Sequence, residues 1–179
     1  MTRPTVAVFD FDGTLLDSDE ALIAPFLALG IDRSRVGLGR LLADECAHLG
    51  VTVDDYIAHY DLTASAPFPG INDLLASLPV WGLCSNKLPD AGATELARLG
   101  WTPTAMFFAR GTPKSLVPVL DELGVDGSDV LYVGDTDHDR ECAVEVGARF
   151  ALAGWNPRAR PTDGDVVLEA PADVLDLLA

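Results

Sequence analysis

The chain has 179 residues, and 49% of them are hydrophobic, which is enough to bury the core of one domain with a modest insertion. Its 28 acidic residues outnumber its 12 lysines and arginines, so the formal net charge is -16. Such a charge repels nucleic acids and anionic lipid surfaces, and we expect neither as a partner. An anionic substrate would need a local positive charge, and the only lysines are Lys87 and Lys114.

The cysteines and the first residues indicate where the protein works. Three cysteines, at positions 46, 84 and 142, match no metal or redox spacing, and we interpret them as reduced thiols. The N-terminal residues lack the apolar segment of a signal peptide, and no run approaches 18 apolar residues. We therefore expect a cytoplasmic protein, without a membrane partner, that is a monomer or a weak homodimer.

Short apolar runs rich in β-forming residues alternate with helical patterns along most of the chain. The runs are almost continuously apolar, as is typical of strands that are covered on both faces. Amphipathic stretches separate most of them, which favours an α/β fold with a Rossmann-like, doubly wound parallel sheet. The predicted strands are residues 5–9, 79–84, 105–109, 130–133, 149–153 and 166–168.

The segment from residue 17 to residue 67 breaks this alternation. It contains no convincing strand, and its apolar residues recur at helical intervals. We predict a small all-helical cap at 17–67, inserted after the first strand into a core made of residues 1–16 and 68–179. Solvated surface or packing is the commoner role of polar residues in such a segment. Its candidates for reading a substrate are Arg33, Arg35, Arg40, His48, Tyr56 and His59.

Polar residues follow four of the predicted strands, at the positions where the loops of an open parallel sheet carry ligand sites. Taken singly, each has a plain interpretation as a helix cap or a solvated turn. Four groups in this order favour one common site. The residues are Asp10 and Asp12 after the first strand, Ser85 and Asn86 after the second, Lys114 at the start of the helix after the third, and Asp135 and Asp139 after the fourth.

The pattern resembles the haloacid dehalogenase superfamily, and in particular its phosphoglycolate-phosphatase-like branch. The stretches DFDGT, CSN, TPKS and GDTDHD are similar to the four family motifs, and the resemblance covers roughly residues 5 to 155. It implies a phosphatase in which Asp10 is the nucleophile, Asp12 the general acid and base, and Ser85 and Lys114 further catalytic residues. It also implies phosphate contacts from Gly13, Ser85, Asn86 and Lys114, and Mg²⁺ held by Asp10, the backbone carbonyl of Asp12 and Asp135, with Asp139 in or just behind that shell.

The resemblance leaves several activities to compare. Asp12 argues against a dehalogenase, because a halide leaves without a proton. The absence of lysine between residues 17 and 67 argues against a phosphonatase, which uses a cap lysine. A phosphotransferase or mutase would need a larger cap to exclude water, and a noncatalytic domain that binds a phosphorylated ligand or a protein is a further alternative. We predict hydrolysis of a small phosphate monoester metabolite.

Residues beside the motifs have two interpretations each. Lys87 is either an ordinary surface residue or a contact to the far end of the substrate. His138 either faces the cleft or is an exposed loop residue. Ser85 could also cap the helix that follows it. Cys84 lies within an apolar strand, and we expect it to be a buried packing residue.

Overall fold

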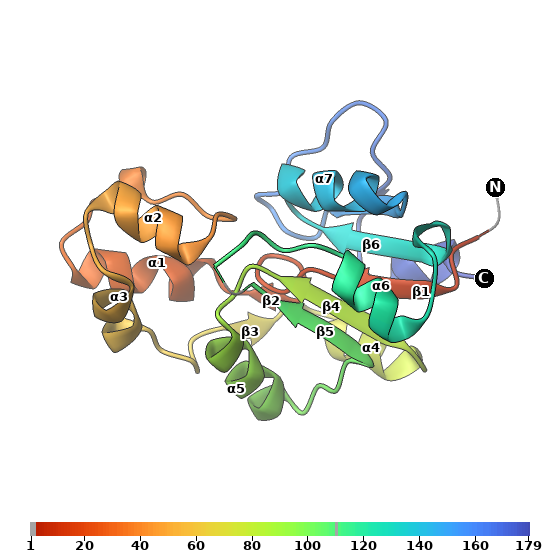
Figure 1. Cartoon of the computed structure of the whole chain (residues 1–179), viewed down its shortest axis with the longest axis horizontal. Coiled ribbons are helices and arrows are strands. Elements are labelled where there is room, and N and C mark those ends of the chain that lie inside the picture. The colour runs from red at the N-terminus through yellow and green to blue at the C-terminus, as the bar shows by residue number, and fades with distance from the viewer. Residues whose placement is uncertain (1–2, 110) are drawn as a thin grey trace.

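The computed structural model describes residues 3–109 and 111–179, and its centre is a six-stranded parallel sheet (Figure 1). The strands lie in the order β5-β4-β1-β6-β7-β8. The predicted α/β class and the six predicted strands are confirmed, with ends that differ by at most two residues. Their bounds are β1 Val6–Phe9, β4 Trp81–Ser85, β5 Ala105–Phe108, β6 Val130–Gly134, β7 Arg149–Ala153 and β8 Val167–Leu168.

The register of the central strands aligns their carboxyl ends. Phe9, the last residue of β1, is level with Leu83 of β4 and with Val133 of β6. The backbone N–H of Asp10 still donates to the carbonyl oxygen of Val133, at 2.9 Å. The loops that follow β1, β4 and β6 therefore leave the sheet at one edge, where their polar side chains can meet.

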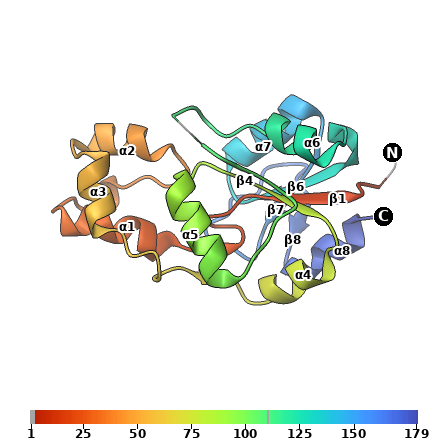
Figure 2. The ribbon, with the colours of Figure 1, turned by 60° about the horizontal axis from the view of Figure 1, so that its bottom comes forward.

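Helices cover both faces of the sheet (Figure 2). In β1, Ala7 and Phe9 belong to the core cluster on one face, whereas Val8 belongs to the cluster on the other. Burial on both faces explains why the strands are continuously apolar in sequence. The first face is covered by α4 Ile71–Ser77, α5 Pro89–Leu99 and α8 Val174–Leu177, and the second by α6 Val117–Leu123 and α7 Asp137–Val146.

Three further helices lie together beside the carboxyl edge of the sheet (Figure 1). Their buried side chains Phe26, Cys46, Leu49 and Tyr56 form a hydrophobic cluster that is separate from the two clusters of the sheet. The rings of Phe26 and Tyr56 contact each other, with centroids 4.7 Å apart. The helices are α1 Asp19–Ala28, α2 Leu42–Leu49 and α3 Val53–His59, with a 3₁₀ turn at Arg33–Arg35.

The expectation that residues 17–67 contain no strand is wrong at both ends of that segment. β2, Leu16–Asp17, pairs in antiparallel fashion with β3, Ala66–Pro67. Two-residue strands are too short to leave an alternating pattern in the sequence. This pairing joins the outgoing and returning chain at the base of the helical segment. Across residues 3–109 and 111–179, the helices are too short or too polar to cross a lipid bilayer.

Candidate active site

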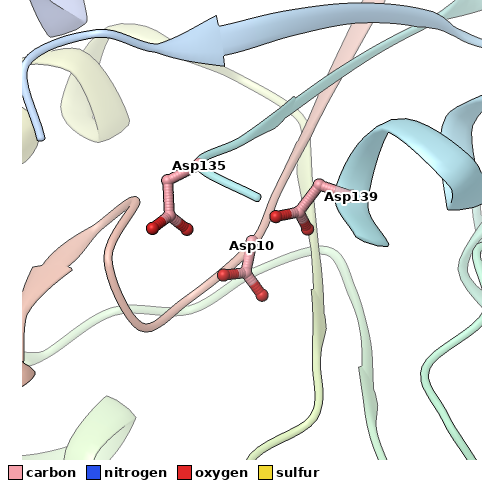
Figure 3. A group of neighbouring side chains, drawn as sticks. All are labelled: Asp10, Asp135 and Asp139. Carbon is pink, nitrogen blue, oxygen red and sulfur yellow. The ribbon is translucent and has the colours of Figure 1, made fainter. Parts of the chain in front are cut away.

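Three buried carboxylates converge beyond the edge of the sheet (Figure 3). One oxygen of each of Asp10, Asp135 and Asp139 lies within 4.8 Å of the other two. Asp10 follows β1, Asp135 follows β6, and Asp139 stands in the first turn of α7. The structure thus brings together three of the four predicted metal ligands through their side chains.

The crowding of these acids favours a bound cation. Burial raises the pKa of Asp10 well above its usual value despite the opposing charge of Lys114, and the charges of Asp139 and Asp135 raise it further. Burial, followed by the charge of Asp139, raises the pKa of Asp135 to about 7. Buried carboxylates at this spacing are unfavourable unless a positive charge compensates them. Mg²⁺ is a hard ion that prefers carboxylate oxygens, so the residues present fit it.

Lys114 supplies a positive charge inside this group. Its Nζ lies 2.5 Å from Oδ1 of Asp10 and 2.6 Å from Oδ1 of Asp139. Burial alone would lower the pKa of Lys114, but the charges of Asp10 and Asp139 outweigh it and hold that pKa well above its usual value. The expectation that Lys114 opens a helix is wrong, because α6 begins at Val117 and Lys114 lies in the preceding loop. That loop is held in place where the N–H of Lys114 donates to Oδ1 of Asn86, at 2.8 Å.

Asp139 has both carboxylate oxygens occupied by donors. Oδ1 accepts from Lys114 and from the hydroxyl of Tyr132, at 2.9 Å, and Oδ2 accepts from the N–H and the hydroxyl of Thr136, at 3.0 and 2.6 Å. Burial would raise the pKa of Asp139, but Lys114 and these hydrogen bonds lower it below its usual value. Asp139 therefore holds Lys114 and the start of α7 in place, which favours a position just behind the predicted metal ligands.

Asp12 has a different cationic partner. Its Oδ1 and Oδ2 accept from Nζ of Lys87, at 2.8 and 3.1 Å. Lys87 is only 8% exposed, so its interpretation as a surface residue is wrong. The side chain of Asp12 is not part of the group of three carboxylates, and metal binding by its backbone carbonyl stays a prediction.

Gly13 is required by both its conformation and its neighbour. Its φ of +81° lies in the left-handed region, which side chains with a Cβ rarely adopt. A Cβ built on Gly13 would lie 2.4 Å from Oδ2 of Asp135. The backbone of the DFDGT turn thus approaches the carboxylates as closely as it does because this residue has no side chain.

Ser85 and Asn86 line the same site from the end of β4. Oγ of Ser85 accepts from the N–H of Lys87, at 3.1 Å. The interpretation of Ser85 as a helix cap is wrong, because α5 begins at Pro89 and Leu88 occupies its N-cap position. Besides holding the Lys114 loop through its side-chain oxygen, Asn86 donates from its amide to the carbonyl oxygen of Gly39, at 3.5 Å.

Sequence reasoning missed the residues that support the site from the end of β7. Nδ2 of Asn156 donates to the carbonyl oxygen of Gly13, at 2.8 Å, and to Oδ2 of Asp135, at 3.0 Å. Trp155 donates from its indole nitrogen to the carbonyl oxygen of Thr14, at 2.9 Å. These residues follow a predicted strand, so the rule that located the other four loops would have found them. Glu95, a buried acid of α5, carried no such signal.

A cavity of about 580 Å³ extends from the carboxylates to the helical segment. Two of the six candidate substrate-reading residues, Arg40 and Tyr56, line it, whereas the other four are absent from its lining. His138 is also absent from the lining; it lies in the first turn of α7 rather than in a loop, with Nδ1 3.6 Å from Glu141. The helical segment contributes mainly apolar and aromatic side chains, from Leu22, Phe26, Leu38, Leu42, Tyr56, Ile57, Tyr60 and Leu62.

Comparison with known proteins agrees with this fold. The family model of haloacid dehalogenase-like hydrolases matches residues 4–147. Among curated proteins, the chain is 26% identical to the N-acetylmuramic acid 6-phosphate phosphatase of Pseudomonas aeruginosa, over 98% of this chain and 95% of that protein. It is 28% identical to a phosphoglycolate phosphatase of Xylella fastidiosa, over 94% of this chain and 90% of that protein.

Solved structures show the same fold. A haloacid dehalogenase-like family protein from Streptococcus pneumoniae superimposes with a TM-score of 0.78 at 22% identity, over 98% of this chain and 99% of that one. A haloacid dehalogenase superfamily hydrolase of subfamily IA from Geobacter sulfurreducens gives a TM-score of 0.72 at 20% identity, over 98% of this chain and 97% of that one. The chain belongs to the haloacid dehalogenase-like hydrolase family, and within that family it is a phosphatase.

Proposed function

We propose that the protein is a Mg²⁺-dependent phosphatase that hydrolyses a small phosphate monoester through an aspartyl-phosphate intermediate on Asp10. The observation that carries the proposal is the convergence of Asp10, Asp135 and Asp139 around one point, with Lys114 bound to Asp10 and Asp139. The group combines a nucleophile, oxygen ligands for a divalent cation and one fixed ammonium group. These are the parts that phosphoryl transfer requires.

In this proposal Asp10 attacks the phosphorus atom, and the ester oxygen leaves. Attack by a carboxylate divides one difficult displacement into two easier ones, because water later hydrolyses the aspartyl-phosphate. The nucleophile must be ionised, although burial raises its pKa. Lys114 favours the ionised form. Asp10, the carbonyl of Asp12 and Asp135 would hold a Mg²⁺ ion, which would supply the further positive charge for the phosphoryl oxygens.

Asp12 is the proton carrier in this proposal. It protonates the ester oxygen as that oxygen leaves, and it then takes a proton from the water that attacks the phosphorylated Asp10. Asp12 stands two residues after Asp10 at the end of β1 and lines the same cavity. A separate carboxylate is needed because Asp10 is phosphorylated when the water is activated.

The phosphoryl group needs donors for the oxygens that carry charge during transfer. We assign this role to the hydroxyl of Ser85, the backbone N–H of Asn86 and the ammonium group of Lys114, with Gly13 allowing the backbone to pass close beneath. Ser85, Asn86 and Lys114 all line the cavity. Their donors stand on the loops after two different strands, so the fold of the sheet arranges them before the substrate binds.

The cavity supports a small organic phosphate as the substrate. Its volume of about 580 Å³ is within the roughly 300–1,000 Å³ of small-molecule sites. We propose that residues 17–67 act as a cap whose apolar and aromatic side chains contact the organic part.

The alignment with the Pseudomonas phosphatase spans 215 positions, more than the 179 residues of this chain, so this chain lacks segments that the relative has. The net charge of -16 further favours a free metabolite over a nucleic acid.

A phosphate-release assay on the purified protein tests the proposal. The panel would contain 2-phosphoglycolate, sugar 6-phosphates including N-acetylmuramic acid 6-phosphate, pyrophosphate and p-nitrophenyl phosphate. We expect hydrolysis in Mg²⁺ that excess chelator abolishes and that Ca²⁺ restores poorly, because Ca²⁺ forms longer and looser bonds. Full activity in chelator would contradict the metal assignment. Faster turnover of a phosphorylated protein or of a nucleic-acid end than of any metabolite would contradict the substrate class.

A further inference from the structure

The two aspartates of DFDGT are held by different lysines. Lys114 contacts Asp10, and Lys87 contacts Asp12. We propose that Lys87, anchored by Glu95 and linked through Tyr60 to the helical segment, is a positioning residue that orients the carboxyl group of Asp12, so that the proton it carries as the acid reaches the leaving group. The inference rests on the proposed function, because it assigns to Asp12 the acid role given above.

Lys87 is enclosed by groups that leave its ammonium little freedom. Nζ contacts both oxygens of Asp12, at 2.8 and 3.1 Å, and donates to the hydroxyl of Tyr60, at 3.0 Å. It forms an ion pair with Oε2 of Glu95 at 2.8 Å, without hydrogen-bond geometry. It also lies 5.5 and 5.4 Å from the ring centres of Phe11 and Tyr60, within the range of cation–π attraction. A lysine held on all sides can orient the carboxylate that it binds.

Glu95 anchors this lysine from the core. It is fully buried on α5, and its Oε1 accepts from the hydroxyl of Ser65, at 2.8 Å, and from that of Tyr60, at 3.2 Å. A buried carboxylate is costly unless partners satisfy it, so a side chain with three partners is held in one position. Glu95 does not line the cavity and is not needed for the chemistry described above. Within residues 3–109 and 111–179, Glu95 is connected to the site through Lys87 and Tyr60.

The charge on Lys87 is retained despite burial. Desolvation by itself would lower the pKa of Lys87, but the charges of Asp12 and Glu95, together with Tyr60, raise it well above its usual value. The positioning role is supported by geometry, because the ammonium group is engaged by both oxygens of Asp12, by the hydroxyl of Tyr60 and by Glu95.

The same network reaches the helical segment. Tyr60 caps the C-terminus of α3, and Ser65 directly precedes β3 in the segment that returns to the core. Arg98 of α5 donates to the carbonyl oxygen and the hydroxyl of Ser65, at 2.9 and 3.2 Å. The returning chain and Asp12 are thus bound to the same buried pair, so the position of the helical segment and the orientation of Asp12 are connected through Lys87 and Glu95.

Positioning of the acid should matter in proportion to how much the leaving group needs a proton. Phenoxide is a poor leaving group and needs one, whereas p-nitrophenoxide leaves readily without it. A small displacement of a catalytic group costs on the order of 100-fold in rate. The value of kcat/KM reports the steps up to the release of the alcohol or phenol, so it isolates this proton transfer from the later hydrolysis of Asp10.

The test compares kcat/KM for phenyl phosphate and p-nitrophenyl phosphate in the Mg²⁺-loaded protein. For Lys87→Met we expect a loss on the order of 100-fold with phenyl phosphate and less than about 10-fold with p-nitrophenyl phosphate. Lys87→Arg keeps the charge and should recover part of the phenyl phosphate activity. Tyr60→Phe removes only the hydroxyl that bridges Lys87 and Glu95. It should also lose more activity with phenyl phosphate than with p-nitrophenyl phosphate, but by a smaller factor than Lys87→Met.

Two further variants control for folding. Lys87→Met leaves Glu95 buried without its cation, so the double variant Lys87→Met/Glu95→Gln removes both charges together. We expect this variant to melt closer to the unaltered protein and to keep the selective loss with phenyl phosphate. Asp165→Asn breaks an ion pair outside the cavity and should leave the ratio of the two substrates unchanged.

The outcomes separate this inference from the proposed function. An equal loss with both substrates in Lys87→Met and in the folded double variant, with selective loss in Asp12→Asn, would overturn the role of Lys87 and leave the role of Asp12 intact. If Asp12→Asn showed no selectivity, the acid role of Asp12 would fail and the inference with it. If the unaltered protein hydrolysed neither these aryl phosphates nor any member of the panel, the proposed function itself would fail.

Discussion

Nδ2 of Asn156 lies 3.0 Å from Oδ2 of Asp135 and donates a hydrogen bond to it. The same nitrogen donates to the carbonyl oxygen of Gly13, at 2.8 Å, and Asn156 is only 3% exposed. One buried amide therefore ties a proposed metal ligand to the turn that carries both aspartates of DFDGT. Groups that orient a metal ligand in this way are commonly worth about 10- to 100-fold in metal affinity.

We expect Asn156→Ala to raise the Mg²⁺ concentration for half-maximal activity by about 10- to 100-fold. Asp135 keeps its charge but loses the donor that orients it. Asn72→Ala is the control. The side chain of Asn72 also forms a hydrogen bond, accepting from the indole of Trp101 at 2.9 Å, but Asn72 lies outside the cavity. Titration of activity with Mg²⁺ measures the effect, and equal half-activation values in the two variants would contradict the role of Asn156.

Alanine substitutions at Gly13 and at Gly30 distinguish the cost of a strained backbone from the cost of crowding by a new side chain. Both have left-handed φ values, +81° and +80°, but a Cβ meets Asp135 at Gly13 and nothing within 4 Å at Gly30. Alanine should cost about 1–2 kcal/mol of unfolding free energy at either position through the backbone. Only Gly13→Ala should also displace Asp135 and reduce kcat by more than about 100-fold. Urea unfolding and phosphatase assays measure the two effects, and an active Gly13→Ala protein would refute the crowding argument.

The two aspartates of DFDGT have unequal duties in the proposed mechanism. Asp10→Asn removes the attacking carboxylate, so neither product nor covalent intermediate should form. Asp12→Asn keeps the nucleophile and removes the base that activates water, so p-nitrophenyl phosphate should still phosphorylate Asp10 and hydrolysis should then be slow. Rapid quench followed by intact mass measurement should detect a phosphorylated species in the Asp12 variant alone. Near-normal turnover by Asp10→Asn would place the nucleophile elsewhere.

The ion pair between Arg140 and Asp165 should give stability that depends on acid pH. Nε and Nη2 of Arg140 donate to the two oxygens of Asp165, at 2.9 and 2.7 Å. The hydrogen bond from Arg140 lowers the pKa of Asp165 to about 2 in the folded protein, against about 3.9 in an unfolded chain. Because the folded pKa is the lower one, the contribution is complete above about pH 5 and is lost as the pH falls toward 2.

Asp165→Asn should therefore lower the unfolding free energy by about 1 kcal/mol at pH 6, and by less at pH 3. Urea unfolding of the two proteins at both pH values measures the difference. The difference between the two proteins shrinks at low pH, because Asp165 of the unaltered protein is then protonated and loses the charge that asparagine also lacks. A difference that grew on acidification would show that the pair does not depress the pKa of Asp165.

The sequence alone was sufficient to predict the parts of this protein that depend on local pattern. Continuous apolar runs mark β1, β4 and β6 because those strands are buried on both faces, and the polar residues directly after them had to meet at one edge of a parallel sheet. The convergence of Asp10, Asp135 and Asp139 follows from this rule together with the motifs. The class of fold and the group of three carboxylates were thus accessible from the sequence.

Tertiary packing alone decided which charges meet away from the strand ends. A glutamate in an amphipathic helix is ordinarily exposed, so nothing in α5 marks Glu95 as fully buried, and a lysine after a strand is ordinarily solvated. Lys87 and Asp12 are 75 positions apart, and their contact depends on how α5, the DFDGT turn and the returning chain pack together. Periodicity reports which face of an element is apolar, but the pairing of two buried charges depends on distances that only the folded chain sets.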